Sequence, residues 1–425
     1  MELRKLVSLL LLAALAIGSA LSLTSCKKDE EEVTRIHTEY EGTTLYVYNW
    51  GEYISDGSEG SLDVVDRFEK TYGIEVKYDY YSTNEELYAQ LNSDAKYDVI
   101  IPSDYMIAKL LEEDKLMKLD RSKLTNYGNV DPAYLGQYFD PTSEYAVPYA
   151  VGMIGVVYNT KLVDAEDVAD ESWDLLWNPK YGDGQIINFN NPRDAFGVAM
   201  IEQGLSVNTT DPDEWERAYD RLREQDCIYL MDEVFNKMEN GSASVAAYYA
   251  GDCISMMGIN PDLAFYYPTE GTNIFIDAMC IPKTAQNPGA AHLFIDFMLS
   301  EEIATANANY ICYASPNTAV LTSPDYDFGE GTEGYSILYE LPESYRTDSS
   351  KMQYYHNLDA DTLALMNELW TRLGVEDTEE GGLELGTYVF LAIVVALIGW
   401  IGFYYGKKLY LSLKTRKHSI KAERQ

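Results

Sequence analysis

The chain has 425 residues, of which 46% are hydrophobic and 24% charged, and its formal net charge at pH 7 is −37. The imbalance is largest between residues 27 and 406, where 67 acidic side chains accompany 23 basic ones and give a net charge of −44. This charge argues against nucleic acid as a partner, because phosphate binding needs a basic face. A field of this sign attracts cations, although acidity also keeps an exported protein soluble.

The first 25 residues have the pattern of a secretory signal peptide, with a short basic start and an apolar run at residues 6–17. The sequence Leu23-Thr24-Ser25-Cys26 resembles the lipobox of bacterial lipoproteins, which implies cleavage before Cys26 and lipidation of its sulfur. The alternative is ordinary cleavage that leaves a spare cysteine. Residues 26–42 would then be a lipidated tether, since the charged run after Cys26 has no apolar face.

The other end of the chain predicts a transmembrane helix. Residues 386–406 carry no charged side chain and are long enough to cross the hydrocarbon core of a bilayer. An acidic linker, residues 376–385, precedes this run, and a basic tail, residues 407–425, follows it. By the positive-inside rule the tail is cytoplasmic and the large domain lies outside the cell membrane. A buried core helix is the alternative, but it would need no such charge asymmetry.

Between the two ends lie about 340 residues, a length that favours two lobes over one. A predicted strand that starts at residue 45 and breaks at Gly51, and further strands at residues 74–81 and 97–101, alternate with predicted amphipathic helices at residues 62–72, 84–91 and 106–119. This alternation indicates an α/β fold whose parallel sheet is covered on both faces.

The later part of the chain continues the pattern. Two extended apolar runs, residues 145–158 and 273–282, are predicted to cross between the lobes. The other predicted elements are short strands at residues 185–189 and 244–249 and helices at residues 173–177, 211–225, 288–309 and 361–373.

Several predicted strands end in loops that combine aromatic, hydroxyl and acidic side chains. Trp50 and Tyr53 follow the first strand, and Ser103 and Tyr105 follow the third. In open α/β sheets, ligands bind in the crevice outside the carboxyl ends of the strands. Rings and carboxylates together suit a ligand that is cationic and partly apolar, although each ring taken alone is equally compatible with a place in the core.

Five such segments occur in an order that resembles the spermidine/putrescine-binding proteins of bacterial ABC importers. They are Tyr48-Asn49-Trp50 with Tyr53, Pro102-Ser103-Asp104-Tyr105, Asn191-Pro192-Arg193-Asp194-Ala195-Phe196, Phe275-Ile276-Asp277 and Tyr313-Ala314-Ser315-Pro316-Asn317. The resemblance covers about residues 44–374. It implies a two-lobed fold of the periplasmic-binding-protein type that closes like a hinge on a polyamine, passes it to permease subunits, and has no cofactor and no catalytic activity.

On this reading the first lobe comprises residues 43–148 and 275–320, and the second comprises residues 149–274 and 321–375. The resemblance also implies the ligand-binding residues, with aromatic rings around the amine chain, a hydroxyl contact, and carboxylates for the ammonium groups. They are Trp50, Tyr53, Ser103, Tyr105, Asn191, Asp194, Tyr249, Phe275, Asp277, Tyr313 and, by a loose alignment to a glutamine contact, His356.

Three positions depart from the family pattern. Asn191 stands where the spermidine binder has a second carboxylate, and Tyr249 and Phe275 replace tryptophans. With one fewer fixed negative charge, the site would favour a shorter diamine, unless an acid such as Asp104, Asp232 or Asp252 compensates.

Parts of the sequence are also compatible with other functions. An exported glycan hydrolase also uses paired carboxylates among aromatic rings. Against this alternative, no acid pair stands out in the sequence, the chain has only four histidines, and it contains no nucleophile elbow and no metal-binding motif. A binding protein for another small cation or an anion, and a membrane-anchored sensor, are further alternatives. The sequence leaves open whether the four exterior cysteines, Cys227, Cys253, Cys280 and Cys312, form disulfides.

Overall fold

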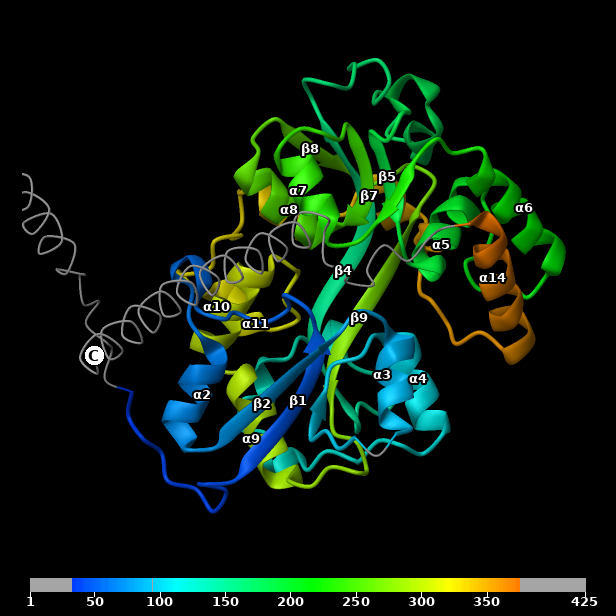
Figure 1. The fold of residues 1–425 in the computed structure, drawn as a ribbon. Helices are drawn as coiled ribbons and strands as arrows, with labels where there is room; N and C mark the ends of the chain where they lie inside the picture. The colour runs from blue at the N-terminus through cyan, green and yellow to red at the C-terminus, as the bar shows by residue number, and fades with distance from the viewer. Residues whose placement is uncertain (1–32, 94, 375–425) are drawn as a thin grey trace, which may run out of the picture.

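The computed structural model describes residues 33–93 and 95–374. These residues form two α/β lobes joined by one mixed sheet (Figure 1). None of their helices is both long and apolar enough to span a membrane. The predicted signal peptide, Cys26, the acidic linker, the predicted transmembrane helix at residues 386–406 and the basic tail lie outside the described residues.

The first lobe is built on three parallel strands. β1 (Thr44–Trp50) pairs on one side with β2 (Glu75–Tyr81) and on the other with β3 (Val99–Ile100). In β1 the side chains of Leu45 and Val47 are fully buried and that of Tyr46 is 40% exposed, as the predicted alternation requires, but Tyr48 is 3% exposed, so both faces are covered in the second half of the strand.

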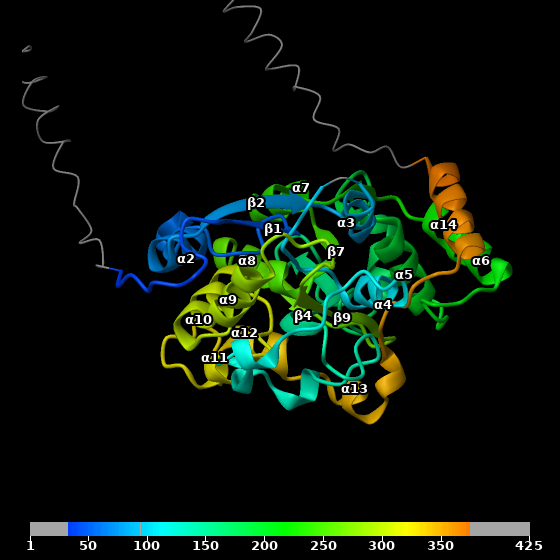
Figure 2. The ribbon, with the colours of Figure 1, turned by 90° about the horizontal axis from the view of Figure 1, so that it is seen from below.

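Helices cover this part of the sheet. The helices α2 (Val64–Tyr72), α3 (Asn84–Leu91), α4 (Asp104–Glu112), α9 (Pro288–Met298), α10 (Glu301–Ile311) and α11 (Thr318–Thr322) belong to this lobe (Figures 1 and 2). Two of them differ from the predictions. The helix predicted at residues 106–119 ends at Glu112, and Asp114 has φ +55°. The single helix predicted at residues 288–309 is two helices, because Ser300 is extended and caps α10.

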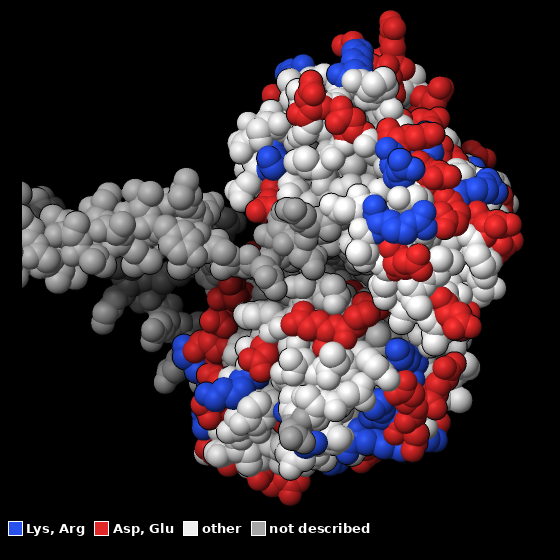
Figure 3. Space-filling model, turned by 45° about the vertical axis from the view of Figure 1, so that its right-hand side comes forward, with Lys and Arg blue, Asp and Glu red and all other residues white. Residues whose placement is uncertain are grey.

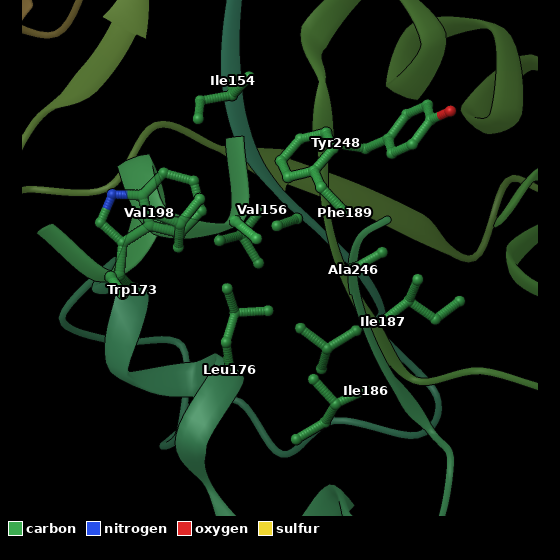
Figure 4. Packing of buried hydrophobic residues seen from close by; sticks show 14 of the residues in the cluster. Ile154, Val156, Trp173, Leu176, Ile186, Ile187, Phe189, Val198, Ala246 and Tyr248 are labelled. Carbon is green, nitrogen blue, oxygen red and sulfur yellow. The ribbon is translucent and has the colours of Figure 1, made fainter. Parts of the chain in front are cut away.

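The second lobe contains β5 (Ile186–Phe189), β6 (Ile228–Leu230), β7 (Val245–Tyr249) and β8 (Leu263–Tyr266). Its helices are α5 (Pro192–Glu202), α6 (Pro212–Arg223), α7 (Glu233–Glu239) and α8 (Ala250–Ile259). The last helix, α14 (Ala360–Leu373), lies beside α6, and Arg372 pairs with Glu216 there at 2.8 Å (Figures 1 and 2). The core of this lobe gathers around the fully buried Trp173 (Figure 4).

Two long antiparallel strands join the lobes. β4 (Ala146–Asn159) pairs with β9 (Thr272–Cys280) along its first half and with β7 and β8 along its second half. The resulting strand order is β2-β1-β3-β9-β4-β7-β5-β6. Apolar side chains along nearly all of β4 fit this central place, since the strand is buried on both faces.

A third connection runs from α12 (Glu333–Tyr339) and α13 (Glu343–Thr347) through β10 (Met352–Gln353), which pairs with the start of β9. Short 3₁₀ helices occupy Ser58–Gly60, Arg121–Lys123, Tyr127–Asn129, Pro132–Tyr134, Trp173–Trp177, Pro179–Tyr181 and Ser349–Lys351. Of the two states that the sequence left open for the cysteines, the structure has free thiols at all four described positions.

Candidate ligand-binding site

A cavity of about 220 Å³ lies where the two lobes meet. Acidic side chains are prominent on the face of the molecule seen in Figure 3, including a row near the junction of the lobes. The cavity is lined from the first lobe, from the second lobe and from the crossing strands. Ten of the eleven predicted site residues line it: Trp50, Tyr53, Ser103, Tyr105, Asn191, Asp194, Tyr249, Phe275, Asp277 and Tyr313.

The crossing strand β9 places Asp277 in the lining of this cavity. Asp277 lies opposite Ala150 of β4 and next to Ser103, and its side chain is only 3% exposed. The Tyr53 hydroxyl donates to Asp277 Oδ2 at 2.8 Å, whereas Oδ1 has no hydrogen-bond partner among the described residues. Burial raises the pKa of Asp277 to about 6, against the opposing effect of the nearby Ser103 and Tyr53 hydroxyls. Asp277 is therefore a buried acceptor that faces a cavity.

Asp194 lies in the first turn of α5, where the helix dipole favours a negative charge. Its Oδ2 accepts hydrogen bonds from Asn191 Nδ2 at 2.8 Å and Tyr249 Oη at 2.7 Å, and its Oδ1 accepts one from Tyr355 Oη at 3.1 Å. Burial raises the pKa of Asp194 to about 6 even though these tyrosine hydroxyls lower it. Arg193 stacks on the Tyr355 ring, 4.6 Å from its centre, and its positive charge also acts to lower the pKa of Asp194.

A third carboxylate, Asp252, lies in the first turn of α8. Tyr313 Oη donates to its Oδ2 at 3.0 Å. Burial raises the pKa of Asp252 to about 7, and the negative charges of Glu52 and Asp232 add to this increase. All three acids line the cavity. All three acids that could compensate for Asn191 also line the cavity; Asp232 is exposed, whereas Asp252 is partly buried.

Asp104 has a different environment. It is fully buried, and its carboxylate accepts hydrogen bonds from the backbone N–H groups of Tyr105 at 2.7 Å and Ile276 at 3.4 Å. Burial raises its pKa well above the usual value for an aspartic acid. These bonds tie the start of α4 to β9, so Asp104 supports the neighbouring site residues.

Aromatic rings form the walls between the carboxylates. The Tyr53 and Tyr313 rings meet edge to face with centroids 5.1 Å apart, and Phe275 lies between Tyr313 at 6.3 Å and Tyr249 at 5.7 Å. Trp50 packs on Tyr81 at 4.6 Å. Tyr81 was absent from the predicted site, although it ends β2 in register with Trp50 at the end of β1.

His356 does not line the cavity. Its side chain is exposed and packs on the Tyr138 ring with centroids 4.7 Å apart. The preceding residue, Tyr355, lines the cavity instead and bonds to Asp194. His356 contributes through its backbone, because its carbonyl accepts a hydrogen bond from Arg193 at 3.1 Å. Successive side chains of an extended segment point to opposite sides, so an alignment shifted by one residue selects the wrong one.

Two glycines let the rings approach the backbone. A Cβ atom at Gly152 would lie 2.2 Å from the Phe275 ring, and one at Gly251 would lie 2.4 Å from the Tyr313 ring. Both distances are far shorter than a van der Waals contact. The position of each ring therefore depends on the absence of a side chain beneath it.

Two lobes joined by crossing strands, with an acidic and aromatic cavity between them, define a binding protein that closes around a small solute. Residues 63–329 match the family model for bacterial extracellular solute-binding proteins. The chain belongs to this family, and it is an extracytoplasmic binding protein rather than an enzyme. The exported-hydrolase alternative is set aside on this ground.

Relatives of known name agree with this assignment. The spermidine/putrescine-binding periplasmic protein of Escherichia coli K12 is 34% identical over 292 residues, which cover 67% of this chain and 81% of the relative. The putrescine/cadaverine-binding protein of Pseudomonas aeruginosa PAO1 is 28% identical over 344 residues, 77% of this chain and 93% of the relative. A solved structure, the putative spermidine/putrescine ABC transporter from Listeria monocytogenes, has a TM-score of 0.69 and 31% identity and covers 78% of this chain and 98% of its own.

The packing of Tyr313 on Gly251 generates a prediction. Gly251→Ala should destabilise the fold by about 1–3 kcal/mol, because the added methyl group overlaps the Tyr313 ring and the core must shift to admit it. Urea unfolding of the two proteins measures this difference.

Gly258→Ala is the matched control, since Gly258 lies in the same helix and a Cβ there would meet no atom within 4 Å. The control should be neutral or more stable by up to about 1 kcal/mol, the gain in helix propensity. Equal stability of the two variants would contradict the packing described for Tyr313.

Proposed function

We propose that the protein is the extracytoplasmic polyamine-binding component of an ABC importer, which captures a polyamine such as putrescine or spermidine between its lobes and delivers it to permease subunits. The observation that carries this proposal is Asp277 Oδ1, a buried carboxylate oxygen without a partner among the described residues, in a cavity walled by rings. The names of the relatives at 31–34% identity support the same ligand class.

The proposed chemistry follows from the structure of a polyamine, in which methylene groups link two or more ammonium groups. Burying an ammonium group is costly unless a carboxylate meets it. Asp277 offers such a carboxylate from β9, and Asp194 and Asp252 offer others from the second lobe. Rings such as Phe275 and Tyr313 can cover the methylenes and attract the adjacent cations, worth about 0.5–2 kcal/mol per ring.

Closure of the lobes is the proposed signal to the permease. The ligand would contact residues of both lobes, such as Tyr53 and Asp252, so it would stabilise the closed form over the open one. The hinge would lie in the connections at β4, β9 and β10. We propose the lobe limits as residues 43–148 with 275–320 and residues 149–274 with 321–375.

Membrane attachment is proposed at both ends, through a lipid on Cys26 and a transmembrane helix at residues 386–406. The two anchors can be tested separately by membrane fractionation of cells. We expect Cys26→Ala alone, or truncation after residue 374 alone, to leave the protein on the membrane, and the double change to release it. Full release by Cys26→Ala alone would rule out the second anchor.

A second candidate ligand is a short amine that also carries a carbonyl or carboxylate oxygen. Two buried donors of cavity-lining residues, Trp50 Nε1 and Arg193 Nη1, have no hydrogen-bond partner among the described residues. A fully charged polyamine offers no acceptor to such donors. Calorimetry with a diamine and with the ω-amino acid of equal length separates the two candidates. A polyamine site would bind the diamine and exclude the amino acid, and a site for the second kind of ligand would do the reverse.

Removal of the Asp277 charge tests the proposal. Asp277→Asn should weaken polyamine binding by at least about 2 kcal/mol, because a buried ammonium group loses its counter-charge. Asp220→Asn is the control, since the Asp220 side chain is 72% exposed on α6. Titration calorimetry of both variants gives the affinities, and an unchanged affinity in Asp277→Asn would remove this residue from the site.

The raised pKa values generate a pH prediction. Asp194 and Asp277 have pKa values of about 6, and Asp252 of about 7, so each loses its charge as the pH falls through these values. We expect full affinity for a polyamine above about pH 8 and a loss of up to about tenfold per pH unit for each protonated site below its pKa. Affinity that is constant from about pH 8 to pH 5 would contradict this role.

The same shifts act on the ligand-free protein with the opposite sign. The folded state holds these protons at a higher pH than an unfolded chain, whose aspartates titrate near 3.8. The contribution of the three acids to the free energy of unfolding therefore falls as the pH rises from about 4 to 7, and bound ligand should reverse this trend.

A further inference from the structure

We propose that the Tyr249 hydroxyl makes the site selective for a diamine, because it occupies Asp194 and leaves Asp252 and Asp277 as the carboxylates within the cavity that have open oxygens for ammonium groups. This inference rests on the proposed function. It gives Tyr249 a role in specificity in addition to that of its ring in the wall of the cavity.

The three carboxylates differ in how many protein groups already bond to them. Asp194 accepts three hydrogen bonds from side chains, from Asn191, Tyr249 and Tyr355, at 2.7–3.1 Å, and the Tyr355 hydroxyl shares its proton with the Arg193 carbonyl. A carboxylate has about four lone-pair positions, so Asp194 is nearly saturated. Asp277 accepts one from Tyr53 and keeps a buried oxygen without a partner in the described chain.

The donors to Asp194 are held by the surrounding structure. Asn191 caps α5 and accepts the Arg193 N–H at 3.0 Å, which fixes the orientation of its amide. The Tyr249 ring packs between Phe189 at 5.1 Å and Phe275 at 5.7 Å. An ammonium group at Asp194 has only the remaining position on Oδ1, and it gains a second bond there only by displacing one of these donors, at a cost similar to that of a lost hydrogen bond.

The two remaining carboxylates lie at either side of one aromatic wall. The Tyr53 hydroxyl bonds to Asp277, the Tyr313 hydroxyl bonds to Asp252, and the two rings touch edge to face at 5.1 Å. A short chain of methylenes along these rings can carry one ammonium group to each carboxylate. A third ammonium group would meet only the largely occupied Asp194 or the solvent-exposed acids of the lining, Glu52 and Asp232.

The test compares putrescine and spermidine binding to the full chain in detergent by titration calorimetry. The unaltered protein should bind putrescine at least about tenfold more tightly than spermidine, the size of one charge-assisted hydrogen bond. Tyr249→Phe keeps the ring and frees one hydrogen-bond position on Asp194 Oδ2, so it should reduce this preference about tenfold by strengthening spermidine binding.

Two further tyrosine variants complete the design. Tyr313→Phe removes a hydroxyl from Asp252 but leaves Asp194 occupied, so it should not improve spermidine binding. Tyr355→Phe removes a different donor from Asp194 and should change the preference for putrescine in the same direction as Tyr249→Phe. The inference can therefore be tested even if Tyr249→Phe does not fold.

The outcomes separate the inference from the proposed function. If the unaltered protein binds neither amine, the proposed function fails. If it binds them but prefers spermidine, or if Tyr249→Phe changes both affinities by the same factor, the polyamine function stands and the role of Tyr249 is overturned.

Discussion

The central constraint on this protein is a negative charge buried in the middle of its sheet. Asp277 lies on a strand that crosses between the lobes, is 3% exposed and has hydroxyl rather than cationic neighbours. A carboxylate in such a place is unfavourable unless a positive charge meets it, and its raised pKa expresses this cost. The site therefore has its full set of interactions only when a cation is bound.

The surrounding structure positions a ligand next to Asp277 in two ways. The crossing strands β4 and β9 place Asp277 at the junction, so a ligand bound there contacts both lobes. The rings around it rest on glycines, Phe275 over Gly152 and Tyr313 over Gly251, which brings flat apolar surfaces close to the acids. Cations with an apolar chain fit this combination, whereas an anion would meet three carboxylates.

Much of this arrangement was predictable from the sequence. The alternation in β1, the glycine after α2 and the long apolar run of β4 each indicate their structure directly. The site residues that follow strand ends were found because parallel strands bring their carboxyl ends together. The resemblance to a known family supplied the roles that this pattern could not.

The errors have local physical causes. One helix was predicted where α9 and α10 meet, because its apolar pattern continues across Ser300, although Glu301 and Glu302 mark a new helix start. Tyr81 was missed because its place in the cavity depends on the pairing of β2 with β1, which short-range patterns do not reveal, and Tyr355 was missed because the loose alignment selected its neighbour His356. The hydrogen bond from Tyr249 to Asp194 likewise joins residues far apart in sequence.

The most direct test of the central claim is the pKa of Asp277 itself, followed by NMR of a protein labelled at the aspartate carboxyl carbons and assigned with Asp277→Asn. The free protein should show a pKa of about 6 for this group. Bound putrescine should lower the value below about 4, the pKa of an unperturbed aspartate, because the ammonium group favours the ionised form. A pKa that is the same with and without saturating amine would contradict the account.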